Sequence, residues 1–316
     1  MIEKLYRRES YVESVKAVTK EKCNRCNGNN IYQDMNGMYY CLDCFEYGEI
    51  SDQMIIYRYQ REIPLKHHVL ETGYELSSLQ IKGSDFLMDC YENKHSGFLQ
   101  AVCGAGKTEM TFQVILAALN RNQKVCFVIP RVSVLKEIYQ RFLKHFPDTV
   151  IKALYEGNKD FNGANLIIST PQQLIYFYSE FDLAIIDEVD AYPFANNRFL
   201  KRLLEKAMKP YGVMVYMSAT ITKEFSSWIK ENRISTYLIP SRFHRRPQVI
   251  PVFKRIKNQK TISKILIQLL SQPRQTLVFV PTIDIGLKYK KMLEVEGFDI
   301  DFVSSKEKYQ RLIINR

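Results

Sequence analysis

The sequence predicts an α/β fold: a parallel sheet covered by helices on both faces, preceded by a small metal-binding module. Three observations lead to this prediction. Short, continuous apolar runs alternate with helical segments from residue 97 onward. Polar clusters directly follow several of these runs, and four cysteines form two Cys-x-x-Cys pairs near the N-terminus. Continuous apolar strands between helices are typical of a parallel sheet that is buried on both faces.

The central feature is the stretch 101–108, which reads Ala-Val-Cys-Gly-Ala-Gly-Lys-Thr and lies between an apolar run and a helical run. A strand, a glycine-rich turn and a helix form a cradle for phosphate. Lys107 would reach the β- and γ-phosphates, and the Thr108 hydroxyl would bind Mg²⁺. The residues of this loop expected to bind ATP are Val102, Cys103, Gly104, Ala105, Gly106, Lys107 and Thr108. An ordinary turn with an exposed lysine is the alternative, because Ala101 stands where this motif usually has glycine.

The four N-terminal cysteines predict a zinc site. Cys23 and Cys26 form one pair, Cys41 and Cys44 the other, and Asn36-Gly37 between them is a turn pair favoured in type I′ hairpins. Four thiolates at this spacing suit one tetrahedral Zn²⁺, which would be structural because no ligand position stays open. Two disulfides or a redox pair are the alternatives.

The remaining elements follow in order. Residues 1–22 show a loose helical spacing and predict a strap, and 46–75 predict a connector with short strands. A helix capped by Ser77 or Ser78 begins near Leu76. We then expect helices at 107–121, 133–145 and 283–296, and strands at 97–100, 125–129, 150–154, 165–169, 183–186, 213–217, 278–282 and 299–303.

Two carboxylates indicate the chemistry. Asp187 follows a buried apolar run directly and is placed to hold Mg²⁺, and Glu188 beside it can orient the attacking water. A helix N-terminal charge pair is the alternative. After a phosphate cradle in the same sheet, the pair predicts ATP hydrolysis, with Lys107, Asp187 and Glu188 as catalytic residues.

The charge is unevenly placed. The chain carries a net charge of +11, and residues 232–283 contain ten Lys or Arg and no Asp or Glu. This segment predicts either a track for a nucleic-acid backbone or a solvated face. We found neither a signal-peptide core nor an apolar run long enough to span a bilayer. We therefore expect a cytoplasmic protein, with a peripheral position at the inner face of the cytoplasmic membrane left open.

Taken in order, these motifs resemble those of superfamily-2 helicases and translocases, which implies RecA-like motor domains. Gln80 resembles the adenine-reading glutamine, and 101–108 resembles motif I. Pro130-Arg131 resembles motif Ia, and Ser169 to Gln173 motif Ib. Asp187 to Asp190 resembles motif II, and 278–282 motif IV. Ser218, Ala219 and Thr220 resemble motif III, which couples hydrolysis to domain motion. The resemblance implies DNA contacts by Arg131, Thr170, Pro171 and Gln172.

The zinc ribbon before the motor and the segment 241–247 narrow the resemblance to the ComFA family of DNA-uptake ATPases. Within that family, Arg242, Arg245 and Arg246 are expected to contact DNA. The resemblance implies ATP-driven import of single-stranded DNA during natural transformation. It also implies partners among the competence proteins, including the membrane DNA channel and a phosphoribosyltransferase-like protein; a homo-oligomer stays open.

We expect three domains: residues 1–60 with strap and ribbon, 61–240 with the first RecA-like motor domain, and 241–316 with a basic linker and an incomplete second RecA-like domain. Motifs V and VI, with the arginines that reach the γ-phosphate, are absent, so we expect a truncated chain with weak turnover. The alternatives are another zinc-bearing superfamily-2 DNA helicase, such as one resembling PriA, and an ATP- and DNA-binding module without efficient turnover. RNA stays open as the nucleic acid.

Overall fold

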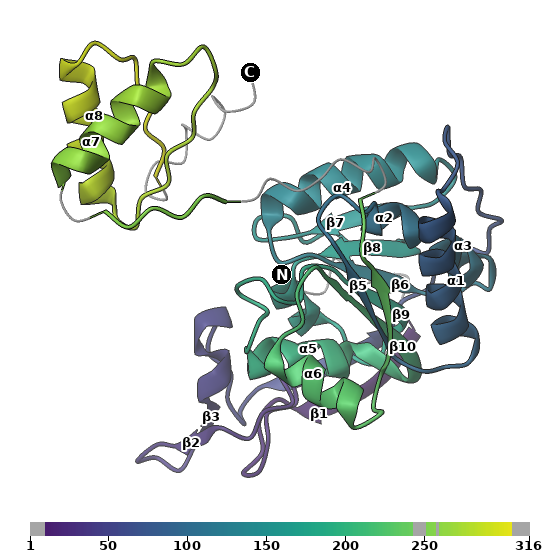
Figure 1. Cartoon of the computed structure of the whole chain (residues 1–316). Helices are drawn as coiled ribbons and strands as arrows, with labels where there is room; N and C mark the ends of the chain where they lie inside the picture. Colours follow the sequence, from purple (N-terminus) through teal and green to yellow (C-terminus); the bar gives the residue numbers. More distant parts are fainter. Residues whose placement is uncertain (1–9, 243–250, 257–258, 305–316) are drawn as a thin grey trace. The chain divides into compact units, whose positions relative to one another are not determined.

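The computed structural model describes residues 10–242, 251–256 and 259–304 (Figure 1). The chain divides into two compact units, residues 1–247 and 248–316, and each is described by itself. Arg245 and Arg246 lie outside the described residues. The three predicted domains stay predictions.

The first unit is built on a seven-stranded parallel sheet with the strand order β11-β5-β10-β9-β6-β8-β7. Every residue of β6 and β8 is buried, as expected for the continuous apolar runs. This confirms the predicted parallel α/β fold. The strands are β5 (Gly97–Ala101), β6 (Val125–Val128), β7 (Ile151–Leu154), β8 (Leu166–Ser169), β9 (Phe181–Ile186), β10 (Met208–Ser218) and β11 (Ser235–Ile239).

Helices cover both faces of this sheet (Figure 1). One core layer includes side chains of α1, α3 and α4, and the other includes side chains of α5 and α6 together with the N-terminal cysteine module. Neighbouring strand residues enter opposite layers, as Phe98 and Leu99 do. The helices are α1 (Ser78–Glu92), α2 (Lys107–Met110), α3 (Phe112–Asn120), α4 (Val132–His145), α5 (Arg198–Ala207) and α6 (Lys223–Lys230), with short 3₁₀ helices η1 (Leu42–Tyr47) and η2 (Pro171–Tyr176).

The helix predicted over 107–121 is interrupted at Thr111, so the prediction of one continuous helix was wrong. The Thr111 hydroxyl donates to the carbonyl of Thr108 at 2.6 Å, and the Thr111 N–H bonds the same carbonyl at 3.0 Å. A side chain that bonds back into the preceding turn often bends a helix. The predicted cap of α1 is confirmed, because Ser77 and Gln80 form a capping box.

The N-terminal module is made of strands. Its hairpin pairs β2 (Ile31–Gln33) with β3 (Tyr39–Cys41). The turn between them is longer than the expected two-residue type I′ turn, because the Asp34 carboxylate accepts the N–H groups of Asn36 and Met38. In the described part of 1–22, residues 10–16 form a strand, where the loose helical spacing had suggested a helix. β1 (Ser10–Lys16) pairs with β4 (Ile55–Gln60), as suits its β-branched valines.

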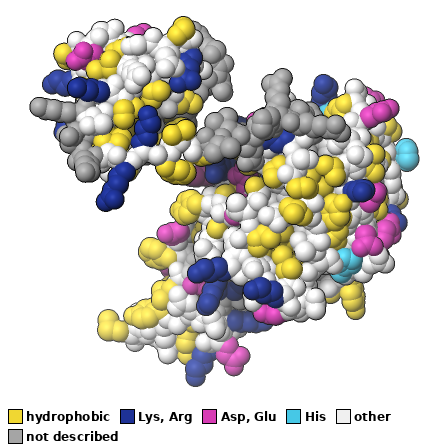
Figure 2. All heavy atoms as spheres, in the orientation of Figure 1, with side chains coloured by type: hydrophobic (Ala, Val, Ile, Leu, Met, Phe, Trp, Pro, Cys, Tyr) yellow, Lys and Arg dark blue, Asp and Glu magenta, His cyan; other side chains and the backbone are white. Residues whose placement is uncertain are grey.

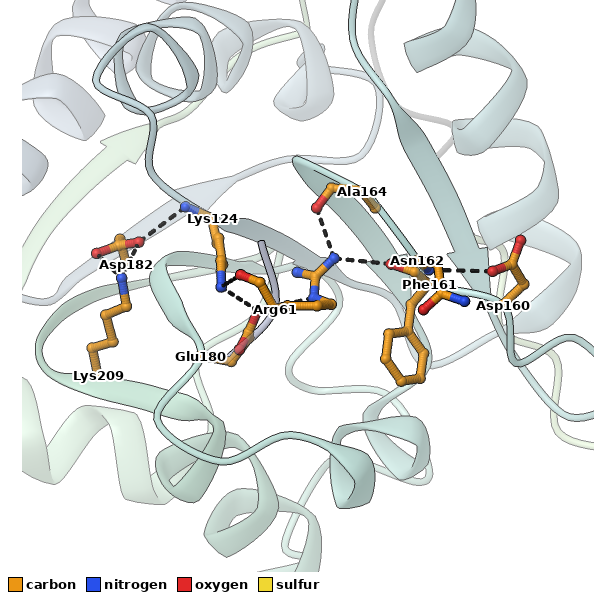
Figure 3. A network of polar contacts seen from close by, with 9 residues as sticks. All are labelled: Arg61, Lys124, Asp160, Phe161, Asn162, Ala164, Glu180, Asp182 and Lys209. Atoms are coloured by element: carbon orange, nitrogen blue, oxygen red, sulfur yellow. Dashed lines mark hydrogen bonds and ion pairs between the residues drawn. The ribbon is translucent and has the colours of Figure 1, made fainter. Parts of the chain in front are cut away.

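A buried ion network joins the residue that follows β4 to the edge of the sheet at which β6 and β9 begin (Figure 3). The Glu180 carboxylate accepts from Arg61 Nε at 2.9 Å and lies 3.0 Å from Lys124 Nζ, and all three residues are buried. Arg61 also donates to the carbonyls of Phe161 and Ala164. Desolvation lowers the pKa of Lys124 despite the charge of Glu180. The network is remote from the carboxyl ends of the strands, so we assign it to stability.

The second unit contains α7 (Gln259–Leu270) and α8 (Ile283–Val295). The strands expected at 278–282 and 299–303 do not form, and within the described residues of this unit no strand is found. A strand needs a hydrogen-bonded neighbour, and neither segment has one here. The basic helix expected near Ser305 lies outside the described residues. Nowhere in the described part of the chain does a helix have the length and apolar composition to cross a membrane.

Candidate nucleotide and nucleic-acid site

Five adjacent strands deliver five polar loops to one edge of the sheet. From β5 through β10, β9 and β6 to β8, all strands run parallel, so their carboxyl ends meet at that edge. In an open α/β sheet this edge is where ligands bind. In the same spatial order, the loops carry residues 101–108, 218–220, 187–190, 130–131 and 170–172.

The phosphate loop has the conformation that its glycines permit. Gly104 and Gly106 have φ values of 79° and 77°, in the left-handed region where glycine carries no steric cost. A Cβ atom on Gly106 would lie 2.3 Å from Gln80 Nε2. Thr108 is buried, whereas Cys103 and Gly104 are exposed. The loop therefore presents its outer turn to solvent and keeps the predicted Mg²⁺ hydroxyl inside.

The Gln80 side chain is hydrogen-bonded to the phosphate loop. Its Nε2 atom donates to the carbonyl of Ala105 at 3.2 Å, and its Oε1 atom accepts from the N–H and hydroxyl of Ser77. A cavity of about 140 Å³ lies beside this site, lined by Tyr74 and Glu109 among others. Burial and the charge of Glu109 raise the pKa of Tyr74 to about 12. Sequence reasoning missed this cavity, although an aromatic residue six positions before Gln80 was available as a signal.

The positive charge of Lys107 acts on the buried carboxylate of Asp187. Asp187 is buried, which raises its pKa to about 6, and the positive charge of Lys107 opposes that rise. The Glu188 N–H donates to Asp187 Oδ1 at 2.9 Å. The Asp187 carboxylate and the Thr108 hydroxyl are oxygen donors of the kind that Mg²⁺ prefers.

The loops after β9 and β10 are joined by side chains. The Thr220 hydroxyl donates to Asp190 Oδ2, and the Thr220 N–H donates to the Ser218 hydroxyl at 3.1 Å. Burial opposes ionisation of Asp190, but the hydrogen bonds from Ser218 and Thr220 outweigh it and lower the pKa. The Ala219 carbonyl accepts from Gln100 in β5. The three predicted coupling residues therefore connect strand β5 with the loops after β9 and β10.

The predicted DNA-contacting residues differ in accessibility. The exposed Arg131 side chain lies with Nε 3.4 Å from Glu188 Oε2. Thr170 and Pro171 are buried, so they shape their loop, and Gln172 is half-buried. Arg242, three residues beyond β11, is also half-buried. Arg131 and Gln172 are therefore the side chains on this edge best placed to reach a ligand.

The four N-terminal cysteines form a cluster that zinc fits. Their Sγ atoms lie within 4.8 Å of one another, and all four residues are buried. Cys23 and Cys44 Sγ are 3.9 Å apart, and Cys26 and Cys41 Sγ are 3.6 Å apart. A tetrahedral Zn²⁺ with Zn–S bonds of about 2.3 Å places its sulfurs about 3.8 Å apart. The thiol geometry matches that spacing.

The cysteine module packs on α5, a contact that sequence reasoning missed. Arg202 of α5 pairs with Asp43, and Phe199 stacks on Tyr47 with ring centroids 5.1 Å apart. Lys206 Nζ donates to the carbonyls of Arg25 and Ile175, at 2.6 and 2.8 Å. Burial lowers the pKa of Lys206 to about 8. In the sequence these cations resemble ordinary surface residues of an amphipathic helix.

The sequence is similar to a known protein family and to two competence proteins. The family model described as "Type III restriction enzyme, res subunit" matches residues 57–223. Competence protein ComFA of Streptococcus pneumoniae is 32% identical over 313 residues, covering 93% of this chain and 72% of that protein. The chain belongs to the ComFA family. ComFA of Bacillus subtilis is 31% identical over 283 residues, covering 84% of this chain and 61% of that protein.

More distant proteins are also similar to this ComFA-family chain. Replication restart protein PriA of Rickettsia prowazekii is 22% identical over 245 residues, covering 70% of this chain and 38% of that protein. Two solved structures each have a TM-score of 0.42. The Sulfolobus solfataricus SWI2/SNF2 ATPase core, solved with dsDNA, is 20% identical and covers 52% of this chain and 36% of its own. A hypothetical ATP-dependent RNA helicase from Sulfolobus tokodaii is 19% identical and covers 53% and 54%.

Proposed function

We propose that this chain is the ATP-driven motor, or part of the motor, that moves single-stranded DNA across the cytoplasmic membrane during natural transformation. The observation that carries the proposal is the order of the five loops along one sheet edge in a ComFA-family chain. The phosphate loop lies toward one side, and the predicted nucleic-acid loop lies toward the other. The carboxylates and Thr220 lie between them, where hydrolysis can be linked to movement.

In the ATP site, Lys107 would bind the β- and γ-phosphates, and Thr108 and Asp187 would hold Mg²⁺. Bound Mg²⁺ supplies a charge that neutralises the phosphates as they separate. Glu188 would orient the attacking water. The buried Asp187 carboxylate beside Lys107 supports these assignments.

DNA would be held mainly through its phosphates. Arg131 and Gln172 are the accessible candidates on the sheet edge, and Thr170 and Pro171 shape the loop. Arg242 of the basic segment 232–283 is a further candidate, as are Arg245 and Arg246, which lie outside the described residues. Backbone contacts carry little sequence preference and weaken as salt rises. A translocating motor needs contacts that do not depend on the base sequence.

The zinc ribbon would serve protein partners rather than DNA. Residues 26–57 contain five Asp or Glu and no Lys or Arg, in a chain whose net charge is +11. Hydrophobic side chains stand out on the ribbon in Figure 2, and Tyr32, Met35 and Phe45 are exposed. The candidate partners are competence proteins at the inner face of the membrane, including the DNA channel and a phosphoribosyltransferase-like protein, or a second copy of this chain.

Transformation of a naturally competent Gram-positive host tests the proposal. The host's own ComFA gene would be replaced by one in which the matching region encodes this sequence, and uptake of labelled DNA into the cytoplasm would be measured. We expect import that Lys107→Ala abolishes and Lys144→Gln, on α4, preserves. Equal import with Lys107→Ala would refute an ATP-driven role.

A further inference from the structure

The sheet places Arg131 next to the carboxylate proposed to direct hydrolysis. β6 and β9 are adjacent, with Val128 opposite Ile186. The Asp187 N–H donates to the Val128 carbonyl at 2.9 Å, so the two chains leave the sheet side by side. This register brings Arg131 Nε to 3.4 Å from Glu188 Oε2.

The Oε2 atom of Glu188 is the carboxylate oxygen that faces Arg131. This atom is buried, and within the described part of the chain no hydrogen bond reaches it. The residue has a φ of 52°, in a region that residues other than glycine rarely adopt. Backbone conformations of this kind cluster at functional sites. Arg131 is therefore the cation that faces this oxygen.

The strand before Arg131 also borders the strand that leads to the proposed DNA loop. On its far side β6 pairs with β8, Val128 opposite Ser169, and β8 leads into the proposed DNA loop 170–172. The Arg131 side chain is 61% exposed, whereas that of Glu188 is 33% exposed. A guanidinium binds a phosphate through two parallel hydrogen bonds, which the single Nε contact with Glu188 does not match.

We propose that Arg131 is a positioning residue. Its ion pair restrains Glu188 when no DNA is bound, and Glu188 is released when the guanidinium binds a DNA phosphate instead. The inference rests on the proposed function and adds a way in which DNA binding would regulate ATP hydrolysis. Glu188 and the phosphate compete for one cation, so DNA binding and the freedom of Glu188 are linked reciprocally. DNA would stimulate hydrolysis because the freed carboxylate can then accept a hydrogen bond from water.

A double-mutant cycle on DNA affinity tests the competition without requiring turnover. Anisotropy of a fluorescein-labelled oligothymidylate would be measured at fixed salt, without nucleotide. Glu188→Gln removes the competing charge, so we expect binding to tighten about two- to fivefold. In the Arg131→Gln background, Glu188→Gln should leave the affinity unchanged. Equal tightening in both backgrounds, or none in the wild type, would overturn the proposal.

Turnover gives the second readout. Without DNA, Arg131→Gln should raise hydrolysis about two- to fivefold and remove stimulation by DNA, while Arg131→Lys should restore part of the stimulation. Lys144→Gln, an equal charge change at the far end of α4, should alter neither rate. A lower basal rate in Arg131→Gln would contradict the restraint.

Different results would contradict the proposed function and the proposed role of Arg131. Full hydrolysis by Glu188→Gln would remove the proposed catalytic role and the function built on it. Loss of hydrolysis in Glu188→Gln, together with no coupling in the binding cycle, would overturn only the role of Arg131.

Discussion

The Thr220 hydroxyl donates a hydrogen bond to the Asp190 carboxylate and so joins the loop after β10 to the loop after β9. Asp190 lies three residues beyond Asp187, and the Thr220 N–H is held by Ser218. These two hydrogen bonds would transmit a change at the proposed Mg²⁺ ligand Asp187 to the loop after β10. On this contact we base the proposal that Thr220 couples hydrolysis to movement.

Thr220→Val removes the hydroxyl and keeps the shape of the side chain. We expect ATP affinity to stay unchanged and DNA-stimulated turnover to fall about fivefold, because one charge-assisted hydrogen bond worth ~1 kcal/mol is lost. Nucleotide titration and steady-state kinetics check this. Ser227→Ala, which removes an exposed hydroxyl bonded to Glu231, is the control. A large loss of ATP affinity would place Thr220 in binding instead.

Zinc should stabilise the whole first unit, because the cysteines share a core layer with α5 and α6. We expect bound zinc in the purified chain and its loss in Cys41→Ser, with the unfolding midpoint lowered by about 5 °C or more. Metal analysis and thermal unfolding followed by fluorescence of Trp228, the only tryptophan in the sequence, provide the readouts. Cys103→Ser should retain the metal. Unchanged stability after zinc loss would mean that the ribbon folds independently.

Glu180→Gln should destabilise the first unit strongly. The substitution leaves Arg61 and Lys124 buried without their shared carboxylate, and breaking a buried charge pair costs about 3 kcal/mol or more. Asp160→Asn breaks the exposed pair with Lys152 and should cost less than about 1 kcal/mol. Urea unfolding monitored at Trp228 compares the two. Similar losses in both variants would contradict the assignment of the buried network to stability.

His68 should make stability pH-dependent. The residue is buried, its Nδ1 lies 2.9 Å from the Thr149 hydroxyl, and burial lowers its pKa below the usual 6.5. The folded chain then binds fewer protons than the unfolded chain, so stability is lost as the pH falls below 6.5 toward the lowered pKa.

His68→Gln removes this titration, so its free energy of unfolding should fall less than that of the wild type between about pH 7.5 and 5.5. Urea unfolding at the two pH values measures the difference. His67→Gln, at the exposed neighbouring position, should keep the wild-type slope. Equal slopes for wild type and His68→Gln would show that His68 is not responsible.

The sequence was most informative where the signal is local. The phosphate loop, the capped start of α1 and the two cysteine pairs each lie within a short stretch, and their spacing reflects the geometry they adopt. Apolar runs likewise located six of the seven strands of the sheet, and β11 was missed. The order of those strands was not predictable, because it depends on hydrogen bonds between segments far apart in the chain.

The missed features depend on tertiary contacts. Arg131 resembled a simple DNA ligand because nothing in the sequence places it opposite Glu188. Lys206 resembled a surface lysine, yet its side chain donates to a carbonyl of the ribbon, that of Arg25. The run Val278–Val280 has strand-like composition, but composition alone does not supply a pairing partner.

Steady-state ATP hydrolysis with and without single-stranded DNA tests the central claim most directly. The wild type, Lys107→Ala and Glu188→Gln would be compared, with nucleotide binding measured in parallel. The account predicts DNA-stimulated hydrolysis in the wild type and its loss in both variants, with ATP binding retained by Glu188→Gln. Hydrolysis that persists in both variants, or that DNA does not alter, would contradict an ATP-driven DNA motor at this sheet edge.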